Sequence, residues 1–574
     1  MLLVSLHQSK NNEASRFIRS CSECGGIDYH HAMVTSMNIF ELIFIAGLMA
    51  LSSVGVLAAS AIPDAEGLPP QTPGTPVFIS SGDSEAGQDN GVAVDTSGEI
   101  MMVWEETNKV LTKRYRSKII GKSSEEGWSA STEIMIPPLT EPVATRVVSV
   151  APGYMLAFWT ARDRRQDIPG GWPYAVWSAS YAKGQWSAAI PVSKTLPVAA
   201  LAGKSPAGQA PTGVSTHHER LAVSTGKDAA SGKAIAVWQE WWCVGACITS
   251  VKLSRIMSAT YNAEKGWSTP IQVNNDSTPT PEEPEVSIDQ QGRAVAVWRQ
   301  RYDRSGTKVS ADSEGLWIQR LHYSVLQPGS TRWAAPHLVE GITPTANVSK
   351  AAISSNAAGD AMIAWAEKKG RKGSDTQENC EVVMATRLVK TDLSWESPKA
   401  VSKPAGDFAC DIVGFNMALD TAGNALVGWT ASVQPERDHV AYAPAGQPWR
   451  AQLPLPYSNS GKTSQLRIAF VSPGRAVVVG TYVKHGQDRR SMRSHIVTHH
   501  FDASKMDTAT TSKADPSQAW TASQRIDWPK GASAQQPTLA IHPNGQAIST
   551  WRQMIPGKAG ISAYTWNTNT AKAP

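Results

Sequence analysis

Charged residues are scarce in this chain of 574 residues, where they make up 18% of the sequence. No dense run of lysine and arginine is present, and the strongest basic cluster, residues 368–372 (KKGRK), falls in an expected surface loop. A protein that binds nucleic acid usually shows such a run or a basic face, so no nucleic-acid partner is expected. The sequence also lacks a long apolar stripe with the 3.6-residue period of a helix outside its N-terminal segment, which argues against a helical fold.

Cysteine is also scarce. The six cysteines are Cys21, Cys24, Cys243, Cys247, Cys380 and Cys410. The first two belong to an N-terminal segment that we expect to lie outside the fold, and no second pair lies near them to complete a zinc site. The remaining four form an even number, which in an exported chain favours disulfide bonds.

The N-terminal residues 1–61 are predicted to be a leader. Residues 42–61 contain no charge and end in the small-residue pattern ASA, which is typical of a secretory signal and its cleavage site. No lysine or arginine lies between Arg19 and Lys109, so the basic stretch that usually precedes such a signal is missing. The same twenty residues are long enough to span a bilayer. We expect a periplasmic or secreted protein, with anchoring in the inner membrane by residues 42–61 as the alternative.

A short unit, glycine followed six positions later by tryptophan, is repeated along the rest of the chain. The pairs are Gly98/Trp104, Gly153/Trp159, Gly232/Trp238, Gly292/Trp298, Gly359/Trp365, Gly423/Trp429 and Gly545/Trp551. An eighth copy, Gly474 with Gly480, keeps the spacing without the indole. In residues 284–300 the unit reads as a short strand, a turn that closes on glycine, and a second apolar strand that ends at the tryptophan. Such a repeat is the signature of an architecture built from one stacked unit.

Each repeat predicts four strands, A to D. Strand A is short, as in residues 91–95 and 417–420, and strand B has apolar residues on both faces, as expected of a strand that is covered on both sides. Strand C alternates between polar and apolar residues, and strand D begins near a second tryptophan. These second tryptophans are Trp128, Trp186, Trp267, Trp333, Trp395, Trp449 and Trp520.

A four-stranded unit with two apolar faces must stack on copies of itself, and closing the stack into a ring removes its exposed ends. The seven intervals between Trp104 and Trp551 average about 64 residues, which predicts eight copies. The last copy lacks strand D, which residues 75–80 (TPVFIS) can supply. We therefore predict an all-β fold, an eight-bladed β-propeller of four-stranded antiparallel blades over residues 75–574, after a Pro/Gly-rich spacer at residues 62–74. Seven blades are the alternative if the copy around Gly474 is irregular.

Two further features recur with the repeat. A carboxylate or amide three positions before the turn glycine can accept hydrogen bonds from the turn amides, and these residues are interpreted as turn caps: Asp95, Asp289, Asn356 and Asp420. A glutamate or glutamine follows the tryptophan by two positions in five copies: Glu106, Glu240, Gln300, Glu367 and Gln553. Because a catalytic pair is needed only once, this recurrence favours a structural role. If the protein is an enzyme, Glu240 or Glu367 is the candidate acid/base in glycan chemistry.

With these repeats the chain resembles bacterial exported β-propeller-repeat proteins, in the broad company of sialidase-like and NHL-type propellers. The resemblance covers nearly all of residues 75–570 and implies the fold rather than a function. The sialidase aspartate box, S-x-D-x-G-x-x-W, has its nearest match at residues 310–317 (SADSEGLW), with one residue too many and a position before strand C. The F-R-I-P segment is also missing, since residues 254–256 (SRI) and 465–468 (QLRI) are poor substitutes. Sialidase activity is therefore not expected.

The connections between strands predict where function lies. In an A-B-C-D meander the B–C and D–A connections emerge on one face, and here they hold most of the insertions. Inserted loops on a rigid scaffold are where binding usually evolves, so this loop-rich face is the predicted working face. Trp241 and Trp242, in an expected B–C loop, are the candidate ligand-binding residues. The alternative is that they cover the central channel.

The four cysteines can be placed on the same face. Cys380 ends a B–C loop and Cys410 lies in the following D–A loop, so a disulfide between them is predicted, with Cys243 and Cys247 as a second pair. Free buried thiols are the alternative. No metal site is predicted from the histidine pairs, which are His217-His218 and His499-His500. No cofactor is expected; the alternative is calcium at the acidic residues of the first loop, Asp83, Glu85 and Asp89, although their spacing matches no known calcium loop.

A non-enzymatic binding module is the function that the sequence favours. It is expected to be a monomer that recognises a glycan or protein partner through the loop-rich face, with no membrane contact unless the leader is retained. A glycan-active hydrolase or lyase in the central channel is the first alternative. A structural envelope protein without a small ligand is the second.

Overall fold

The computed structural model describes residues 76–567, with gaps. The residues left out are 1–75, 81–85, 107–108, 117–126, 139, 164–173, 194–220, 226–231, 245–250, 275–279, 304–316, 343–345, 369–380, 390–393, 403–411, 432–436, 451–452, 456–460, 485–492, 508–518, 522–523, 528–532, 544, 556–557 and 568–574. The predicted leader and spacer lie outside the described residues. Within the described part, no helix is long and apolar enough to cross a membrane. The described helix α3 (Ser504–Asp507) has four residues.

The described strands form eight antiparallel sheets, each one a blade. The strands of blades 1 to 4 are β2 (Ala86–Val94), β3 (Ile100–Glu106), β4 (Lys109–Arg116), β5 (Gly127–Trp128) and β6 (Thr132–Ile134); β7 (Thr140–Ala151), β8 (Tyr154–Asp163), β9 (Tyr174–Ala182), β10 (Gln185–Trp186) and β11 (Ile190–Pro191); β12 (Leu221–Thr225), β13 (Lys233–Val244), β14 (Val251–Asn262), β15 (Gly266–Trp267) and β16 (Ile271–Gln272); and β17 (Pro281–Ile288), β18 (Ala294–Asp303), β19 (Trp317–Leu326) and β20 (His337–Leu338). The strands of blades 5 to 8 are β21 (Asn347–Ser355), β22 (Ala361–Lys368), β23 (Glu381–Arg387) and β24 (Lys399–Ala400); β25 (Ile412–Leu419), β26 (Ala425–Ala431), β27 (Arg437–Ala443) and β28 (Leu453–Pro454); β29 (Gly461–Ser472), β30 (Arg475–Lys484), β31 (Arg493–Asp502) and β32 (Gln524–Arg525); and β33 (Ser533–Ile541), β34 (Gln546–Ile555), β35 (Lys558–Asn567) and β1 (Val77–Phe78).

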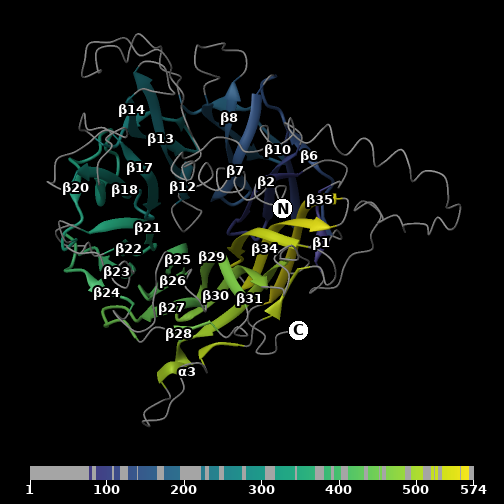
Figure 1. The fold of residues 1–574 in the computed structure, drawn as a ribbon. Coiled ribbons are helices and arrows are strands. Elements are labelled where there is room, and N and C mark those ends of the chain that lie inside the picture. The colour runs from purple at the N-terminus through teal and green to yellow at the C-terminus, as the bar shows by residue number, and fades with distance from the viewer. Residues whose placement is uncertain are drawn as a thin grey trace, which may run out of the picture. The chain divides into compact units, whose positions relative to one another are not determined.

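The blades close into a ring. Strand A of each blade contacts strand A of the next, and β33 of blade 8 contacts β2 of blade 1. The N-terminal β1 pairs with the C-terminal β35, so the two ends of the described chain share one blade (Figure 1). Next to this pair, Ile79 N donates to Ile561 O at 2.7 Å. The eight-bladed propeller and its predicted closure are confirmed, because the copy around Gly474 forms a complete blade of β29 to β32.

Buried tryptophans fill the spaces between blades. The seven tryptophans of strand B are at most 1% exposed: Trp104, Trp159, Trp238, Trp298, Trp365, Trp429 and Trp551. Each packs toward a neighbouring sheet, as Trp365 of blade 5 does against Val297 and Leu321 of blade 4. Burying an indole removes roughly 150–250 Å² from water, so this layer contributes strongly to the cohesion between blades.

The A–B turns confirm the predicted geometry. All eight repeat glycines adopt a φ between 61° and 90°, where residues with a Cβ are strained. The capping side chains accept backbone N–H groups within the turn: Asp95 from Glu99 (2.8 Å), Asp289 from Arg293 (2.9 Å), Asn356 from Asp360 (2.9 Å) and Asp420 from Asn424 (2.8 Å). The second oxygen of Asp95 also accepts the N–H of Gly153 at 2.6 Å, and that of Asp420 accepts the N–H of Gly474 at 2.8 Å. These caps therefore also connect neighbouring blades.

Strand A is longer than the sequence indicated. The strand expected at residues 91–95 begins at Ala86, and the strand expected at residues 417–420 begins at Ile412. The additional residues precede a register shift in the first half of the strand, which occurs in seven blades of the described part. Four of these bulges place a non-glycine residue in the left-handed region nine positions before the turn glycine: Ala144, Glu283, Gln465 and Gln536. The bulge has no glycine to mark it in these four blades.

Strand D is short and interrupted rather than continuous. In blades 1 to 3 the second tryptophan ends a two-residue strand, and another short strand (β6, β11 or β16) then pairs with strand C. In blades 5 and 7 the tryptophan forms a single bridge, Leu388 with Trp395 and Phe501 with Trp520. Short outer edges offer little backbone for pairing with another chain, which protects the rim of a propeller from aggregation.

Candidate functional site

The two tryptophans predicted to bind ligand lie on a strand instead of in a loop. Strand β13 continues to Val244, with Trp241 opposite Ser254 and Trp242 opposite Leu253 of β14. Tryptophan and valine favour extended backbone, so residues 241–244 (WWCV), which contain no charged side chain, prolong the strand. The expected loop assignment is wrong at these two residues. Their ligand-binding role stays a prediction.

Most of the other predicted features fall outside the described residues. Cys243 lies on β13, whereas Cys247, Cys380 and Cys410 are not described, so both disulfides stay predictions. Each of the eight B–C connections includes residues that are not described, and the loop-rich face therefore stays a prediction as well. Asp83 and Glu85 also lie outside the described part. Within that part, no three His, Cys, Asp or Glu side chains form a group that could hold a metal ion.

The glutamates and the glutamine two positions after the strand-B tryptophan lie on the same strand and accept hydrogen bonds from the buried indoles. The indole Nε1 of the tryptophan donates to Glu106 in blade 1 (2.9 Å), Glu240 in blade 3 (3.1 Å), Glu367 in blade 5 (2.8 Å) and Gln553 in blade 8 (2.7 Å). Glu240 is also ion-paired with Arg255 at 2.5 Å, and both side chains are buried. These contacts favour the structural interpretation of the position. A catalytic role for Glu240 or Glu367 stays a prediction.

Blade 4 contains a partly buried network of charges that joins the start of its strand A to the end of its strand B. Arg301 Nη2 lies 2.6 Å from Glu282 Oε1, and Gln319 donates to the other Glu282 oxygen at 2.9 Å. Arg299 is ion-paired with Glu283, the bulge residue with a φ of 49°. Burial lowers the pKa of Arg299 to about 10, while the charge of Glu282 raises it. Because these charges are paired with each other, the network rigidifies the inner part of blade 4.

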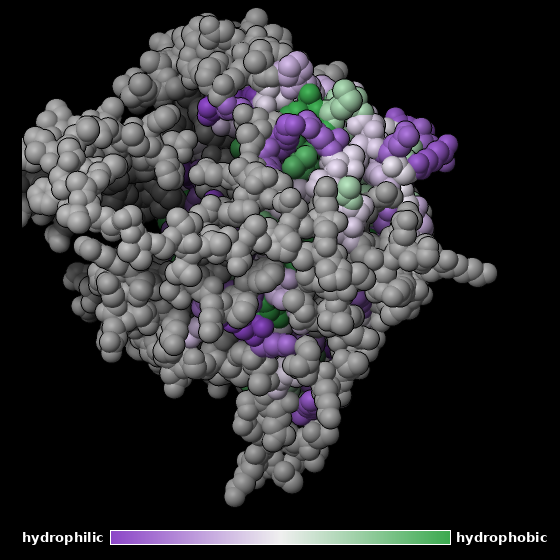
Figure 2. Space-filling view, turned by 90° about the vertical axis from the view of Figure 1, so that its right-hand side faces the viewer, coloured by the Kyte–Doolittle hydropathy of each residue, from purple (hydrophilic) through white to green (hydrophobic). Residues whose placement is uncertain are grey.

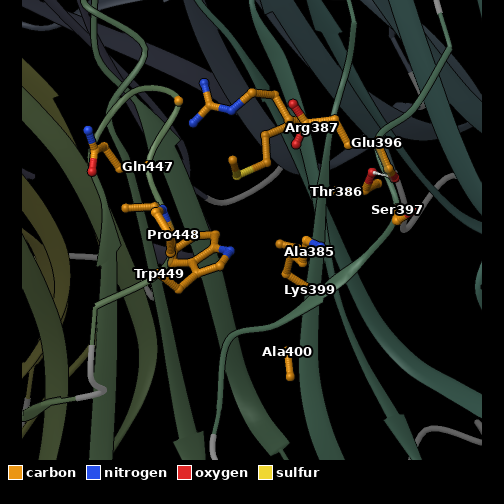
Figure 3. A pocket seen from close by; sticks show the side chains of 13 residues that line it. Ala385, Thr386, Arg387, Glu396, Ser397, Lys399, Ala400, Gln447, Pro448 and Trp449 are labelled. Atoms are coloured by element: carbon orange, nitrogen blue, oxygen red, sulfur yellow. Dashed lines mark hydrogen bonds between the residues drawn. The ribbon is translucent and has the colours of Figure 1, made fainter.

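A cavity of about 470 Å³ lies between blades 5 and 6, and we call it the interblade pocket (Figure 3). Blade 5 contributes Met362 of β22 and residues of β23, of β24 and of the C–D connection between them. Blade 6 contributes the end of β27 and the C–D connection that follows it. The lining residues are Met362, Ala385, Thr386, Arg387, Glu396, Ser397, Lys399, Ala400, Ala443, Gly446, Gln447, Pro448 and Trp449. The pocket belongs to the side of the C–D connections, opposite the predicted loop-rich face.

Trp449 forms one wall of the interblade pocket. The chain reaches it through a turn in which Gln447 N donates to Pro444 O at 3.0 Å and Gly446 has a φ of 65°. The side chain is half-buried, with one part packed against the core shared by blades 5 and 6. Its ring faces the side of the pocket formed by Ala385 and Lys399 (Figure 3). The sequence placed Trp449 only among the tryptophans that start strand D.

Polar groups surround the rest of the interblade pocket. Arg387 is held by a hydrogen bond from Nη1 to the carbonyl of Gly423 in the next blade at 2.8 Å. Thr386 Oγ1 donates to the backbone carbonyl of Glu396 at 2.6 Å, which fixes the connection on which Glu396 lies. Glu396 and Gln447 are exposed. Arginine donates, carboxylate accepts and the amide does both, so the pocket offers both kinds of hydrogen-bonding group to a ligand.

Comparison with known proteins shows no match to a family model and no match to a curated protein sequence. Among solved structures, the chain is similar to the BP39L lectin from Burkholderia pseudomallei, with a TM-score of 0.40 and 12% identity over 77% of this chain and 100% of the lectin. It is similar to a PL25 ulvan lyase, a polysaccharide lyase, with a TM-score of 0.40 and 11% identity over 86% and 96% of the two chains. It is also similar to the NanB sialidase from Streptococcus pneumoniae, with a TM-score of 0.36 and 11% identity over 82% and 84%. At such low scores and identities these similarities do not bear on the ligand of this chain.

Proposed function

We propose that the protein is a carbohydrate-binding β-propeller whose ligand binds in the interblade pocket. The observation that supports this proposal is the half-buried Trp449 beside accessible donors and acceptors in one cavity. Cavities of about 300–1,000 Å³ with aromatic walls and a few converging polar groups are the usual form of small-ligand sites.

The apolar part of the pocket fits the face of a sugar ring. A pyranose has hydroxyl groups around its edge and C–H groups on its faces, so it combines with a flat aromatic surface and with polar groups at the rim. Trp449 supplies the flat surface, with Pro448 beside it and the small side chain of Ala385 on the facing side (Figure 3). An indole has a large apolar surface that is rigid in this position, so stacking costs little conformational entropy.

The polar part of the pocket fits the ring hydroxyls. Each hydroxyl both donates and accepts, and Arg387, Glu396 and Gln447 together offer partners for both roles. Arg387 is already oriented by Gly423, so little reorganisation is needed on binding. The lining has two basic side chains, Arg387 and Lys399, and one acidic side chain, Glu396, so it suits a neutral or singly acidic saccharide better than a highly charged one.

Export is part of this proposal, since residues 42–61 have the composition of a signal segment. A fusion of residues 1–75 to a reporter enzyme that is active only outside the cytoplasm is expected to give activity. A reporter that stays inactive while the fusion accumulates would contradict export.

A glycan array tests the binding proposal with three proteins. Wild type is expected to capture a defined set of saccharides, and Trp449→Ala is expected to lose their binding by about tenfold or more, since an aromatic stacking contact contributes about 1–2 kcal/mol. Trp186→Ala is the matched control, because Trp186 occupies the same repeat position in blade 2, half-buried and away from the pocket. Retained binding by folded Trp449→Ala, or capture of no saccharide by wild type, would contradict the proposal.

A further inference from the structure

In blades 2 to 7, the tryptophan that starts strand D has a partner residue at the end of strand C of its own blade. One backbone hydrogen bond fixes the pair in the same way each time. The residue after the tryptophan donates its N–H to the carbonyl of the residue before the partner, at 2.8 to 3.0 Å. The pairs are Tyr181/Trp186, Tyr261/Trp267, Leu326/Trp333, Leu388/Trp395, Ala443/Trp449 and Phe501/Trp520. The backbone therefore places the six partners alike, and their side chains differ.

Five of the six partners cover the tryptophan with a large side chain. In blades 4 and 5 the partner is a leucine that is 3% exposed. In blades 2, 3 and 7 the partner is aromatic, and its ring lies against the indole. The ring centroids are 5.3, 5.1 and 5.0 Å apart in the pairs Tyr181/Trp186, Tyr261/Trp267 and Phe501/Trp520.

Ala443 of blade 6 is the exception. It is buried in the core shared by blades 5 and 6, and it lines the interblade pocket. An alanine has no side-chain atom beyond Cβ, so the space that a tyrosine ring fills in blades 2 and 3 is left open beside Trp449. Among the described residues that line the pocket, Trp449 is the one aromatic side chain. The pocket therefore lies where one ring is missing from the repeat.

The preceding blade does not supply the missing ring either. At the interface of blades 4 and 5, the ring centroid of Tyr323 lies 5.5 Å from that of Trp395. Ala385 holds the equivalent register position in blade 5, on the side of the pocket that Trp449 faces (Figure 3). A small residue at this position is not unusual, since blade 3 has Ser258 there. The residue that distinguishes the pocket from the other interfaces is therefore Ala443.

Charged side chains accompany the missing ring. The hydrogen bond from Glu396 N to Arg387 O defines two positions at the end of blade 5, and both side chains line the pocket. The same hydrogen bond marks the same two positions in blades 2, 3 and 4, where neither residue is charged. Hydrogen bonds to charged groups are stronger than those between neutral groups. A ring that carries hydroxyl groups therefore finds stronger partners at this interface than at the other three.

We propose that Ala443 determines the specificity of the interblade pocket, and that the ligand inserts one six-membered ring into the space that a tyrosine ring fills beside the equivalent tryptophan of blades 2 and 3. The inference rests on the proposed function for the ring to be that of a saccharide, whereas the place of the ring follows from the comparison of the blades. A tyrosine ring with its hydroxyl group is close in size to a pyranose, so the repeat itself shows what fits.

p-Cresol is the side chain of tyrosine as a free molecule, and it is the direct probe of the missing ring. Saturation-transfer NMR with millimolar p-cresol measures its binding to the full chain. Wild type is expected to bind p-cresol, because an apolar space left by a missing side chain accepts a ring of matching size. A saccharide selected on the glycan array is expected to displace it, since both occupy the same space.

Two variants fill this space with side chains that the repeat already uses. Ala443→Tyr and Ala443→Leu are each expected to weaken the binding of p-cresol and of the saccharide by about tenfold or more, because the added atoms occupy the place of the ring. Urea unfolding is expected to show that both variants fold, since tyrosine and leucine hold this position in other blades. Ala443→Ser is the matched control, and it is expected to bind both probes as wild type does.

A further control addresses adsorption of p-cresol to exposed apolar side chains. Met135 and Ile190 follow or belong to the outer strands of blades 1 and 2 and are 76% and 50% exposed. Figure 2 shows apolar surface on this side of the molecule, where β6 and β10 lie in Figure 1. Ile190→Gln is expected to bind p-cresol as wild type does.

The outcomes separate this inference from the proposed function. The inference would be overturned by wild type that binds no p-cresol, by a saccharide that does not displace it, by saccharide binding that survives in folded Ala443→Tyr and Ala443→Leu, or by an equal loss in Ala443→Ser or Ile190→Gln. A protein with these properties that still captured saccharides would remain a carbohydrate-binding protein. Loss of p-cresol binding in Ala443→Tyr, together with no saccharide captured by wild type, would support the place of the ring and contradict the proposed function.

Discussion

Strands A and B lie side by side in every blade. One position of strand B is nearly constant from blade to blade, whereas one position of strand A varies. In strand B, seven of eight copies place a fully buried tryptophan at the same position, and in four blades the next acceptor along the strand binds the indole N–H. In strand A, the residue seven positions before the turn glycine changes around the ring, and it is Gly91, Arg146, Glu285 and Thr538 in blades 1, 2, 4 and 8. The repeated, fully buried position of strand B serves packing, whereas the varied position of strand A has no single structural role around the ring.

The largest effect is expected in the strand-B layer. Trp365→Ala is expected to lower the free energy of unfolding by about 3–5 kcal/mol, because it leaves a cavity between blades 4 and 5. Urea unfolding followed by intrinsic fluorescence measures the change. Trp449→Ala is the control and is expected to cost clearly less, since its indole is half-buried. Equal costs for the two variants would remove the distinction between packing and pocket tryptophans.

The closure of the ring is expected to be the next most sensitive feature. Gly560 lies on β35, and a Cβ there would overlap the side chains of Phe78 on β1 and of Ser80 two residues later. Gly560→Val is expected to displace β1 and to reduce the free energy of unfolding by about 1–3 kcal/mol.

The double variant Gly560→Val with Phe78→Ala tests the cause of that loss. It is expected to recover part of the stability, because the smaller side chain makes room for the valine. Unfolding midpoints in urea compare the three proteins. A double variant that is less stable than Gly560→Val would show that the pairing of β1 with β35 is not what the valine disturbs.

The strand-B acceptor is expected to tolerate exchange between glutamate and glutamine. Trp551 already uses Gln553 in blade 8, at 2.7 Å, where Trp365 uses Glu367 in blade 5. Glu367→Gln is therefore expected to change the free energy of unfolding by less than about 0.5 kcal/mol, whereas Glu367→Ala leaves the indole N–H unsatisfied and costs about 1–3 kcal/mol. Chemical unfolding of both variants measures this. A glutamine variant as unstable as the alanine variant would mean that the negative charge itself is required.

In blade 7, which lacks the strand-B tryptophan, an effect is expected only as the pH falls. Burial lowers the pKa of His499 on β31 to about 3, with a further contribution from His500. Below pH 6.5 the unfolded chain takes up a proton that the folded chain does not, so stability falls as pH decreases, by up to about 1.4 kcal/mol per pH unit. Urea midpoints at pH 7, 6 and 5 are expected to fall less steeply in His499→Phe than in wild type. Identical slopes would contradict the neutral, buried state of His499.

The sequence predicted the repeated part of the fold because its signals are strong and local. The Gly–Trp spacing indicated eight blades, and the missing last strand indicated that residues 75–80 close the ring, both of which the strand pairing confirms. The caps at Asp95 and Asp420 followed from turn chemistry. The bulges were missed because Ala144 and Gln465 have no intrinsic preference for the left-handed region, which their tertiary surroundings impose.

The interblade pocket was missed for a different reason. Trp449 has the same spacing as the tryptophans that only pack, and its partners Arg387 and Glu396 come from the neighbouring blade. No spacing within one repeat relates residues of two blades, so the pocket appears only once the sheets are placed side by side.

The position of a bound saccharide is the most direct test of the proposed function. A crystal structure of the protein with an oligosaccharide selected on the glycan array is predicted to show a sugar ring stacked on Trp449, with hydroxyls hydrogen-bonded to Arg387 or Glu396 between blades 5 and 6. A saccharide bound on the face of the B–C and D–A connections, with the interblade pocket empty, would contradict the account.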